Sequence, residues 1–227
     1  MIQRFERIGM MKCPSCSSGE IDLHISTFNF RNRSDRNIYN YYICRKCNLI
    51  FLDSSKNEGK NHYSDDYHSY FGLREKNVIK TWLNNLGLKK RLKIVYKHKL
   101  NGNLLDIGCA TGEFLKNLYH NGNWKLYGIE PNTSARKKTE NETDIQTFPD
   151  LFEARFPSDY FDIVTMWDVI EHISNPNELL IEINRILRVG GVLIIKTPDI
   201  SSPEARFFEK FWSGLEAPWH LFLLSKT

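Results

Sequence analysis

Four cysteines in the first fifth of the chain have the residue type and spacing of a metal site. They form two Cys-x-x-Cys pairs, Cys13 with Cys16 and Cys44 with Cys47, separated by residues 17–43. Two such pairs offer four soft thiolates at the spacing that tetrahedral zinc prefers. A redox-active pair would need a βαβ scaffold, which this segment lacks. We therefore expect structural zinc without an open coordination position, the alternative being cysteines that only pack.

A turn of small residues is the second place where chemistry is expected. Gly108, Ala110 and Gly112 follow a short apolar strand and precede a helix, so a ligand could approach the backbone and the helix N-terminal amides. Glu130, at the end of the next strand, could accept hydrogen bonds from ribose hydroxyls. The Gly-x-Gly-x-x-Gly pyrophosphate fingerprint is absent, and Asp106 would repel a pyrophosphate but could pair with a cation. We expect a nucleoside-bearing ligand other than a dinucleotide.

Strands and helices alternate from residue 101 onward. The pattern predicts strands at 104–107, 126–130, 145–148, 160–166 and 192–197, and helices at 112–119, 133–141 and 177–187. The last helix is expected to end at Gly190-Gly191. Such alternation predicts an α/β fold, a Rossmann-like doubly wound and mostly parallel sheet. Earlier in the chain we expect strands at 21–30, 38–43 and 49–52 and two helices, at 78–86 and 90–99.

These elements suggest three regions. Residues 11–53 would form a small zinc-ribbon module, 54–100 a linker and helical lid, and 101–227 the ligand-binding domain. The stretch after Ile195 is too short for a helix and two further strands. The sheet is therefore expected to lack its last strands, and an open sheet edge would favour a homodimer.

Several motifs in the same order resemble those of class I S-adenosylmethionine-dependent methyltransferases. The resemblance covers about 104–225 and rests on Asp-Ile-Gly-Cys-Ala-Thr-Gly at 106–112, Gly-Ile-Glu-Pro at 128–131, residues 161–173, and 187–193. It implies that Asp106 and the backbone of Gly108, Ala110 and Gly112 hold the methionine portion of the cofactor, with Ala110 replacing a commoner glycine. It further implies that Glu130 and Pro131 contact the ribose and that Asp168 borders the cofactor pocket.

A cysteine ribbon ahead of such a domain resembles two groups, sugar or cell-envelope methyltransferases and ribosomal RNA methyltransferases. The segment 216–225 is similar to a stretch of the first group in which a histidine faces the acceptor. By that resemblance His220 is the candidate general base, a role that suits imidazole near neutral pH. Trp219 stands where an acid would be expected. His172, beside Glu171, is the second catalytic candidate, unless that pair only closes the cofactor pocket.

Methyl transfer from a sulfonium needs alignment and, for some acceptors, proton removal, but no metal. We expect transfer to a small-molecule acceptor, such as a nucleotide-sugar or an envelope-polysaccharide precursor. One alternative is an RNA methyltransferase that binds RNA through the ribbon, although no dense basic patch interleaved with aromatics supports nucleic acid. Another alternative is a cofactor-binding protein without catalysis, because the domain is short.

Composition and charge narrow the function further. The chain is 41% hydrophobic, and 31 Lys and Arg against 27 Asp and Glu give a net charge of +4, which permits an anionic substrate. Five cysteines, Cys109 being the fifth, argue against complete internal disulfides. No run reaches the ~18 to 20 apolar residues of a membrane span, and the N-terminus lacks the apolar stretch of a signal peptide. We expect a cytoplasmic protein that starts at Met1, Met10 or Met11.

Overall fold

The computed structural model describes residues 11–32, 34–53 and 78–225, with side chains described from residue 84 onward in the helix that begins at Val78. The linker expected at 54–77 lies outside this range. By packing, the described residues form two units. One contains 11–53, 168–177 and 197–225, and the other contains 78–167 and 178–196. Each unit is described by itself, because their relative placement is not determined.

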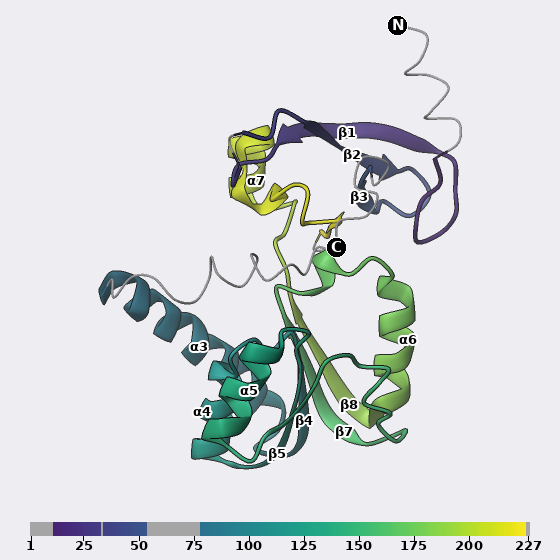
Figure 1. Ribbon diagram of the computed structural model, residues 1–227. Helices are drawn as coiled ribbons and strands as arrows, with labels where there is room; N and C mark the ends of the chain where they lie inside the picture. The colour runs from purple at the N-terminus through teal and green to yellow at the C-terminus, as the bar shows by residue number, and fades with distance from the viewer. Residues whose placement is uncertain (1–10, 33, 54–77, 226–227) are drawn as a thin grey trace, which may run out of the picture. The chain divides into compact units, whose positions relative to one another are not determined.

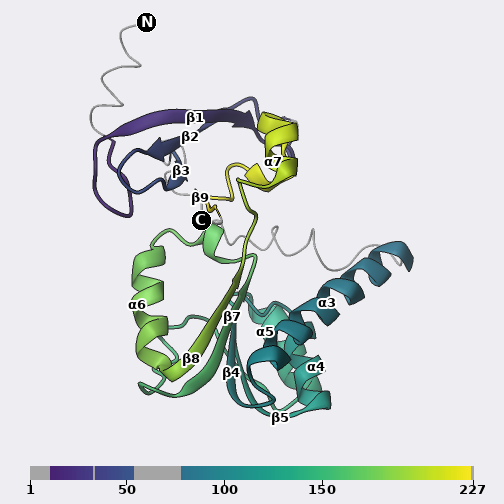
Figure 2. The same cartoon turned by 180° about the vertical axis from the view of Figure 1, so that it is seen from behind.

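The second unit is built on a five-stranded parallel sheet. Its strand order is β6-β5-β4-β7-β8, with β4 Asn101–Ile107, β5 Asn123–Ile129, β6 Gln146–Phe148, β7 Phe161–Trp167 and β8 Leu187–Lys196. The helices are α3 Val78–His98, α4 Glu113–Asn121, α5 Thr133–Glu142 and α6 Pro176–Ile186. Helices α3, α4 and α5 lie on one side of the sheet and α6 on the other (Figures 1 and 2). The predicted doubly wound α/β fold is confirmed.

Two local predictions are wrong. The helices expected at 78–86 and 90–99 form the single helix α3, which runs through Gly87, where nothing lies within 4 Å of an added Cβ. The helix expected to end at Gly190-Gly191 ends at Ile186, and both glycines lie in β8. There the β7–β8 register shifts between Phe161 and Ile163, and Gly190 adopts φ 76°, so the glycines serve a bulge.

The core of this unit fills the space between the sheet and α3 and α4. Helix α4 contributes its apolar side because its buried residues recur at helical spacing. The buried cluster consists of Val95, Leu104, Cys109, Phe114, Leu115, Leu118, Leu126, Ile145, Ile163 and Trp167. This packing fixes the carboxyl ends of β4 and β5, where the turn of small residues begins.

The first unit joins the two ends of the chain in one antiparallel sheet. Its order is β1-β2-β3-β9, with β1 Ile21–Phe28, β2 Ile38–Cys44, β3 Ile50–Leu52 and β9 Phe222–Leu223. Helix α7 Pro203–Phe208 and the 3-10 turns η2 Ile170–His172, η3 Glu209–Phe211 and η4 Ser213–Leu215 complete it. The segment after β8 thus completes the cysteine-bearing unit, and within the described residues no strand pairs with β8 on its outer edge.

A second core holds this unit together. It consists of Tyr39, Tyr41, Ile50, Leu52, Ala205, Trp212, Leu215, Ala217 and Leu223. The Tyr41 hydroxyl lies within hydrogen-bonding distance of the carbonyls of Leu215 and His220, at 2.5 and 2.7 Å, and its single hydrogen is directed at this pair. No helix among the described residues is long and apolar enough to cross a membrane.

Candidate cofactor, metal and histidine sites

The turn after β4 has a backbone that small residues make possible. Gly108, Ala110 and Gly112 have φ values of 77°, 48° and 74°, in the left-handed region. A Cβ on Gly112 would stand 2.6 Å from the side chain of Thr139, so this glycine is required sterically as well. The amides of Gly108 and Cys109 donate to the Ile129 carbonyl at 2.8 and 3.0 Å, which ties the turn to the end of β5.

Glu130 connects the turn to the loop after β5. Its carboxylate is buried and accepts hydrogen bonds from the amide of Ala110 at 3.0 Å and from the amide of Asn132 at 2.8 Å. Asn132 caps α5 by accepting from the amide of Ala135. The exposed Pro131 adds a carbonyl that accepts from Arg136 at 2.8 Å. The acid expected to bind ribose is therefore held in one orientation at the mouth of the turn.

Asp106 lies near the end of β4, the central strand next to β5, and is almost completely buried. Its carboxylate accepts a hydrogen bond from the Thr165 hydroxyl at 2.6 Å, across the β4–β7 pairing. Burial raises the pKa of Asp106 to about 7, and the charge of Glu130 adds to the rise, while Thr165 and Arg91 lower it. A carboxylate in this environment favours a cationic ligand, because a nearby positive charge stabilises the ionised form.

Cys109 serves packing within the same turn. It is buried, and a Cβ on Gly128 of β5 would stand 2.5 Å from its sulfur, so the close pairing of turn and strand needs glycine there. Burial raises the pKa of the Cys109 thiol well above its usual value. Cys109 therefore acts as a small packing residue of the turn, since burial disfavours a reactive thiolate.

The four N-terminal cysteines come together as the spacing predicts. The sulfur of Cys13 is 3.5 Å from that of Cys47, and the sulfur of Cys16 is 3.6 Å from that of Cys44. None of them forms a disulfide. A tetrahedral ion with Zn–S bonds of ~2.3 Å would place its sulfurs about 3.8 Å apart, so the donor set fits zinc with little movement.

The turns that carry the cysteines hold their sulfurs in a polar environment. Burial raises the pKa of Cys44, but the amides of Cys47 and Lys46 donate to it and bring the value down to about 7. The Leu49 amide lowers the pKa of Cys47, yet burial and the neighbouring thiols raise it to about 12. A divalent ion that binds such a cluster displaces the remaining thiol protons.

The two candidate catalytic histidines also come together, in the unit that contains β9. Their rings are 4.7 Å apart and cross at 70°, His172 in η2 and His220 just before β9. Glu171 lies with them, and its carbonyl accepts from the Leu221 amide at 2.7 Å. Burial lowers the pKa of His220 and raises the pKa of Glu171, on which the charges of His220 and Asp168 act in opposite directions. Burial in the cluster thus disfavours the charged forms of both His220 and Glu171.

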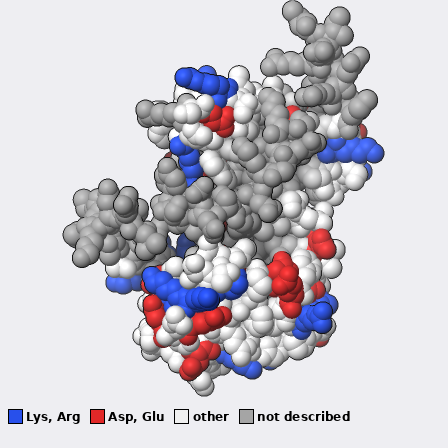
Figure 3. All heavy atoms as spheres, viewed as in Figure 1, with Lys and Arg blue, Asp and Glu red and all other residues white. Residues whose placement is uncertain are grey.

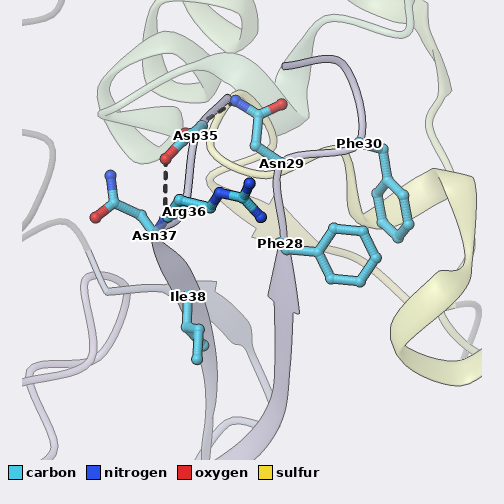
Figure 4. A pocket seen from close by; sticks show the side chains of 7 residues that line it. All are labelled: Phe28, Asn29, Phe30, Asp35, Arg36, Asn37 and Ile38. Atoms are coloured by element: carbon cyan, nitrogen blue, oxygen red, sulfur yellow. Dashed lines mark hydrogen bonds between the residues drawn. The ribbon is translucent and has the colours of Figure 1, made fainter. Parts of the chain in front are cut away.

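A hollow of about 510 Å³ lies at the turn between β1 and β2 (Figure 4). Its lining residues are Phe28, Asn29, Phe30, Asp35, Arg36, Asn37 and Ile38. Figure 4 shows Asp35 turned toward Asn29 and Asn37, and these side-chain and backbone contacts, both 3.0 Å, shape the turn. Because its polar groups stabilise the turn, the hollow is not our candidate for the reaction.

The predicted site residues therefore form three groups. The cofactor residues of the turn and Glu130 lie in the second unit, which contains the parallel sheet. The cysteines form a cluster in the first unit. Asp168, His172 and His220 also belong to the first unit, where they lie near one another. Sequence reasoning missed Thr165 and Asn132, which hold the two acids, and did not include Glu171 as a site residue. An Asn before a helix is an N-cap signal that could have identified Asn132.

Comparison with known proteins agrees with this geometry. Residues 76–227 match the Methyltransferase domain family, and the chain belongs to that family. The family match and the parallel doubly wound sheet define the chain as a class I S-adenosylmethionine-dependent methyltransferase.

Individual relatives share less than a third of their residues with this chain over the matched part. A tRNA U34 carboxymethyltransferase of Shewanella frigidimarina is 28% identical over 111 residues, which are 46% of this chain and 34% of that protein. The corresponding protein of Shewanella woodyi is 29% identical with the same coverage. The chain thus spans about a third of the length of these curated relatives. The YcgJ protein of Bacillus subtilis shares the fold, with a TM-score of 0.50 at 18% identity over 62% of this chain and 63% of that one.

Proposed function

We propose that the chain transfers the methyl group of S-adenosylmethionine to a small-molecule acceptor, such as a nucleotide-sugar or an envelope-polysaccharide precursor. The observation that carries methyl transfer is the turn after β4, where two buried acids, Asp106 and Glu130, flank an open left-handed backbone. That combination suits a ligand with a cationic end and a ribose. It does not suit a pyrophosphate, which Asp106 would repel.

Each residue of the turn then has a role. Asp106 pairs with the ammonium of the methionine portion, and the backbone at Gly108, Ala110 and Gly112 lets that portion approach closely. Glu130, oriented by its hydrogen bonds from the amides of Ala110 and Asn132, accepts from the ribose hydroxyls. Pro131 borders the ribose and Asp168 the edge of the cofactor pocket.

The reaction is an in-line displacement. The bond between sulfur and the methyl carbon breaks as the bond between that carbon and the acceptor atom forms, and a neutral thioether leaves. His220 would take the acceptor proton on Nε2, because its Nδ1 is 2.8 Å from the Gly214 carbonyl and donates there. The Glu216 carboxylate, 3.1 Å from Nε2, would stabilise the resulting imidazolium. His172 holds its place through Nδ1, 2.9 Å from the Trp219 carbonyl.

The charge distribution supports a small acceptor. On the face shown in Figure 3, basic and acidic side chains lie side by side on the second unit and do not form a large patch of one charge. Arg185 and Arg188 contact Glu182 and Asp162, for example. Such pairing reduces the number of cations available to phosphates along a nucleic-acid backbone.

RNA is the second candidate acceptor, and a specific surface favours it. Lys89, Lys93 and Lys97 recur every fourth residue of α3, and all three are exposed. The curated relatives quoted above are named as tRNA-modifying enzymes. For this candidate, RNA retention should fall steeply with salt and with the triple change of these lysines to Gln. Retention that is absent even in low salt would leave only the small-molecule acceptor.

Three further assignments belong to the proposal. The four cysteines hold a structural zinc ion, as their sulfur separations support. The outer edge of β8, with Val189 99% exposed, offers a surface for a second copy of the chain. The cytoplasm, where thiols stay reduced, is the expected compartment.

The proposal is tested by incubating the full chain with methyl-labelled S-adenosylmethionine and a panel of nucleotide-sugars, lipid precursors and RNA. Label should enter a nucleotide-sugar or envelope precursor, and His220→Gln should lower kcat while cofactor binding persists. Label in RNA alone would support the second candidate. Cofactor binding without transfer to any pool would indicate a binding protein without catalysis and overturn the proposal.

A further inference from the structure

Three metal-type donors converge in the unit that carries the cysteines, apart from those cysteines. Glu171 and His172 are adjacent in η2, and His220 comes from the segment before β9. One donor atom from each lies within 4.8 Å of the other two. All three residues are buried, with exposed fractions of 1%, 8% and 4%. Donors from two distant segments are thus held at one point by the packing of η2 against β9.

Both imidazoles are oriented as metal-binding imidazoles usually are. Nδ1 of His172 is 2.9 Å from the Trp219 carbonyl, and Nδ1 of His220 is 2.8 Å from the Gly214 carbonyl. A carbonyl can only accept, so each Nδ1 carries the hydrogen, and in a neutral ring the lone pair is then on Nε2. A ligating histidine typically donates its other ring N–H to a carbonyl or carboxylate in this way.

The carboxylate of Glu171 is the strongest indication of a missing partner. Both of its oxygens are inaccessible to solvent, and neither has a hydrogen-bond partner of good geometry within the described part of the chain. The hydroxyl of Thr197 lies near this carboxylate and is itself buried without such a partner. A buried polar group without a partner is rare, and a buried carboxylate without one is costly. A cation among these residues would neutralise the buried carboxylate of Glu171.

We propose that Glu171, His172 and His220 bind one divalent transition-metal ion, separate from the cysteine cluster. One carboxylate and two imidazoles are a donor set that zinc and its neighbours in the periodic table accept. Tetrahedral bonds of ~2.0 to 2.2 Å would place the three donor atoms roughly 3.3 to 3.6 Å from one another, compared with the present limit of 4.8 Å. Three protein donors leave a coordination position for solvent or a substrate oxygen, unlike the four-thiolate site.

One contact competes with the ion. Nε2 of His220 is 3.1 Å from Oε2 of Glu216, which also pairs with Arg31. When His220 is protonated, the hydrogen on Nε2 joins it to Glu216, and a bound ion would take the place of that proton. The proposal goes beyond methyl transfer and does not rest on it. It gives His220 Nε2 a different use from that of general base, and a direct measurement of metal binding separates the two.

Cobalt is the probe of choice because its spectrum reports the ligand type. The full chain is purified with zinc, dialysed against a chelator and titrated with Co²⁺. We expect one equivalent to bind with visible d–d bands and without the intense near-ultraviolet bands of cobalt–thiolate bonds. Glu171→Gln and His220→Gln should weaken this binding by more than the ~10- to 100-fold that loss of an outer-shell partner causes.

His24→Gln is the matched control, because His24 is an exposed histidine of β1 in the same unit and should leave binding unchanged. If either site variant fails to fold, anomalous scattering from cobalt-soaked crystals of the wild-type chain decides the question. A peak bonded to Glu171 and to Nε2 of both histidines supports the proposal. It is overturned if the wild-type chain binds no Co²⁺, shows only thiolate bands, or has no such peak, or if folded site variants bind like the control.

Discussion

Asp106 carries an energetic conflict that a ligand would resolve. It is 2% exposed, and burial raises its pKa to about 7, so near neutral pH the folded chain holds a carboxylate that prefers to be protonated. The hydrogen bond from Thr165 and the charge of Arg91 offset only part of this cost. Such stored cost at a binding turn is expected where affinity for a cationic group matters more than stability.

Asp106→Asn should therefore stabilise the ligand-free chain and weaken cofactor binding. A folded-state pKa raised from 3.8 to about 7 gives stability that is present below pH 3.8 and is lost as the pH rises through 7. The advantage of Asn over Asp should grow from pH 4 to pH 8, by on the order of 3 kcal/mol. Urea unfolding of both chains at several pH values measures it. If the free energies of unfolding of both chains changed in parallel with pH, the raised pKa of Asp106 would be contradicted.

The partners of the site residues show where sequence reasoning stops. The types and spacing of Asp106 and Glu130 were enough to predict two acids at one turn, because β4, β5 and the turn are local in sequence. Thr165 could not be assigned to Asp106, since that contact depends on the register between β4 and β7. Glu171 was passed over for the same reason. Its proximity to His220 depends on packing between segments far apart in the chain.

At the scale of elements, the turn between β4 and α4 contains one strained residue. Ala110 has φ 48°, a conformation that costs an L-residue with a Cβ roughly 1 kcal/mol or more. Its amide donates to Glu130, so the strain fixes a hydrogen bond that orients the acid. The family resemblance implies that alanine replaces a commoner glycine there, and the positive φ of Ala110 explains why glycine would fit this position more easily.

Ala110→Gly should leave the free energy of unfolding unchanged or raise it by up to about 1 kcal/mol, since relief of strain exceeds or balances the added unfolded-state entropy. Ala205→Gly, in the right-handed helix α7, should lower it by about 1 kcal/mol. Chemical denaturation of the two variants makes the comparison. Equal losses in both would show that the turn conformation is not strained.

The cysteine turns should depend on their metal. Cys47 is exposed, so Cys47→Ser removes a ligand with little loss of packing. We expect the zinc content to fall by one ion per chain and the melting temperature of the first unit to drop, because metal binding contributes to folding. Ser15→Ala, an exposed change in the first turn, is the control. Elemental analysis with thermal melting checks both, and unchanged zinc in Cys47→Ser would contradict the four-thiolate site.

Element types were predictable where the hydrophobic pattern was local, and boundaries were not. Two helices were expected on either side of residues 87–89, yet α3 continues through Gly87, because a glycine inside a helix costs only about 1 kcal/mol. Gly190-Gly191 suggested a helix end, yet the pair lies in a strand bulge, where the same backbone freedom is used. Glycine signals a backbone requirement without saying which one.

At the scale of the whole molecule, the two ends of the chain share one sheet. β9 pairs with β3, Ile50 opposite Leu223 and Phe51 opposite Phe222. The sequence suggested only that the segment after β8 is too short to extend the parallel sheet. That it completes the cysteine-bearing unit could not be read from composition, because a two-residue strand carries too little pattern.

Leu223→Ala should therefore destabilise the N-terminal cysteine module, although it lies at the other end of the chain. Leu223 is 3% exposed in the core around Tyr41, and its truncation should cost roughly 2–4 kcal/mol and weaken zinc retention. Phe207→Ala, at a position 81% exposed in α7, should change the free energy of unfolding by less than about 0.5 kcal/mol. Denaturation and zinc-release kinetics test the difference. Normal zinc retention in Leu223→Ala would contradict the shared core.

The central claim is that the turn after β4 binds S-adenosylmethionine through Glu130. Isothermal titration of the full chain tests it most directly, with Glu130→Gln as the site variant and Glu140→Gln, an exposed acid of α5, as the control. We predict saturable binding to the wild-type and control chains. In Glu130→Gln, the side-chain amide would face the N–H groups of Ala110 and Asn132, where the carboxylate now accepts hydrogen bonds. The affinity for S-adenosylmethionine should therefore fall by about 10-fold or more, which corresponds to at least ~1.4 kcal/mol. No binding to the wild-type chain, or equal affinity in all three, would contradict the account.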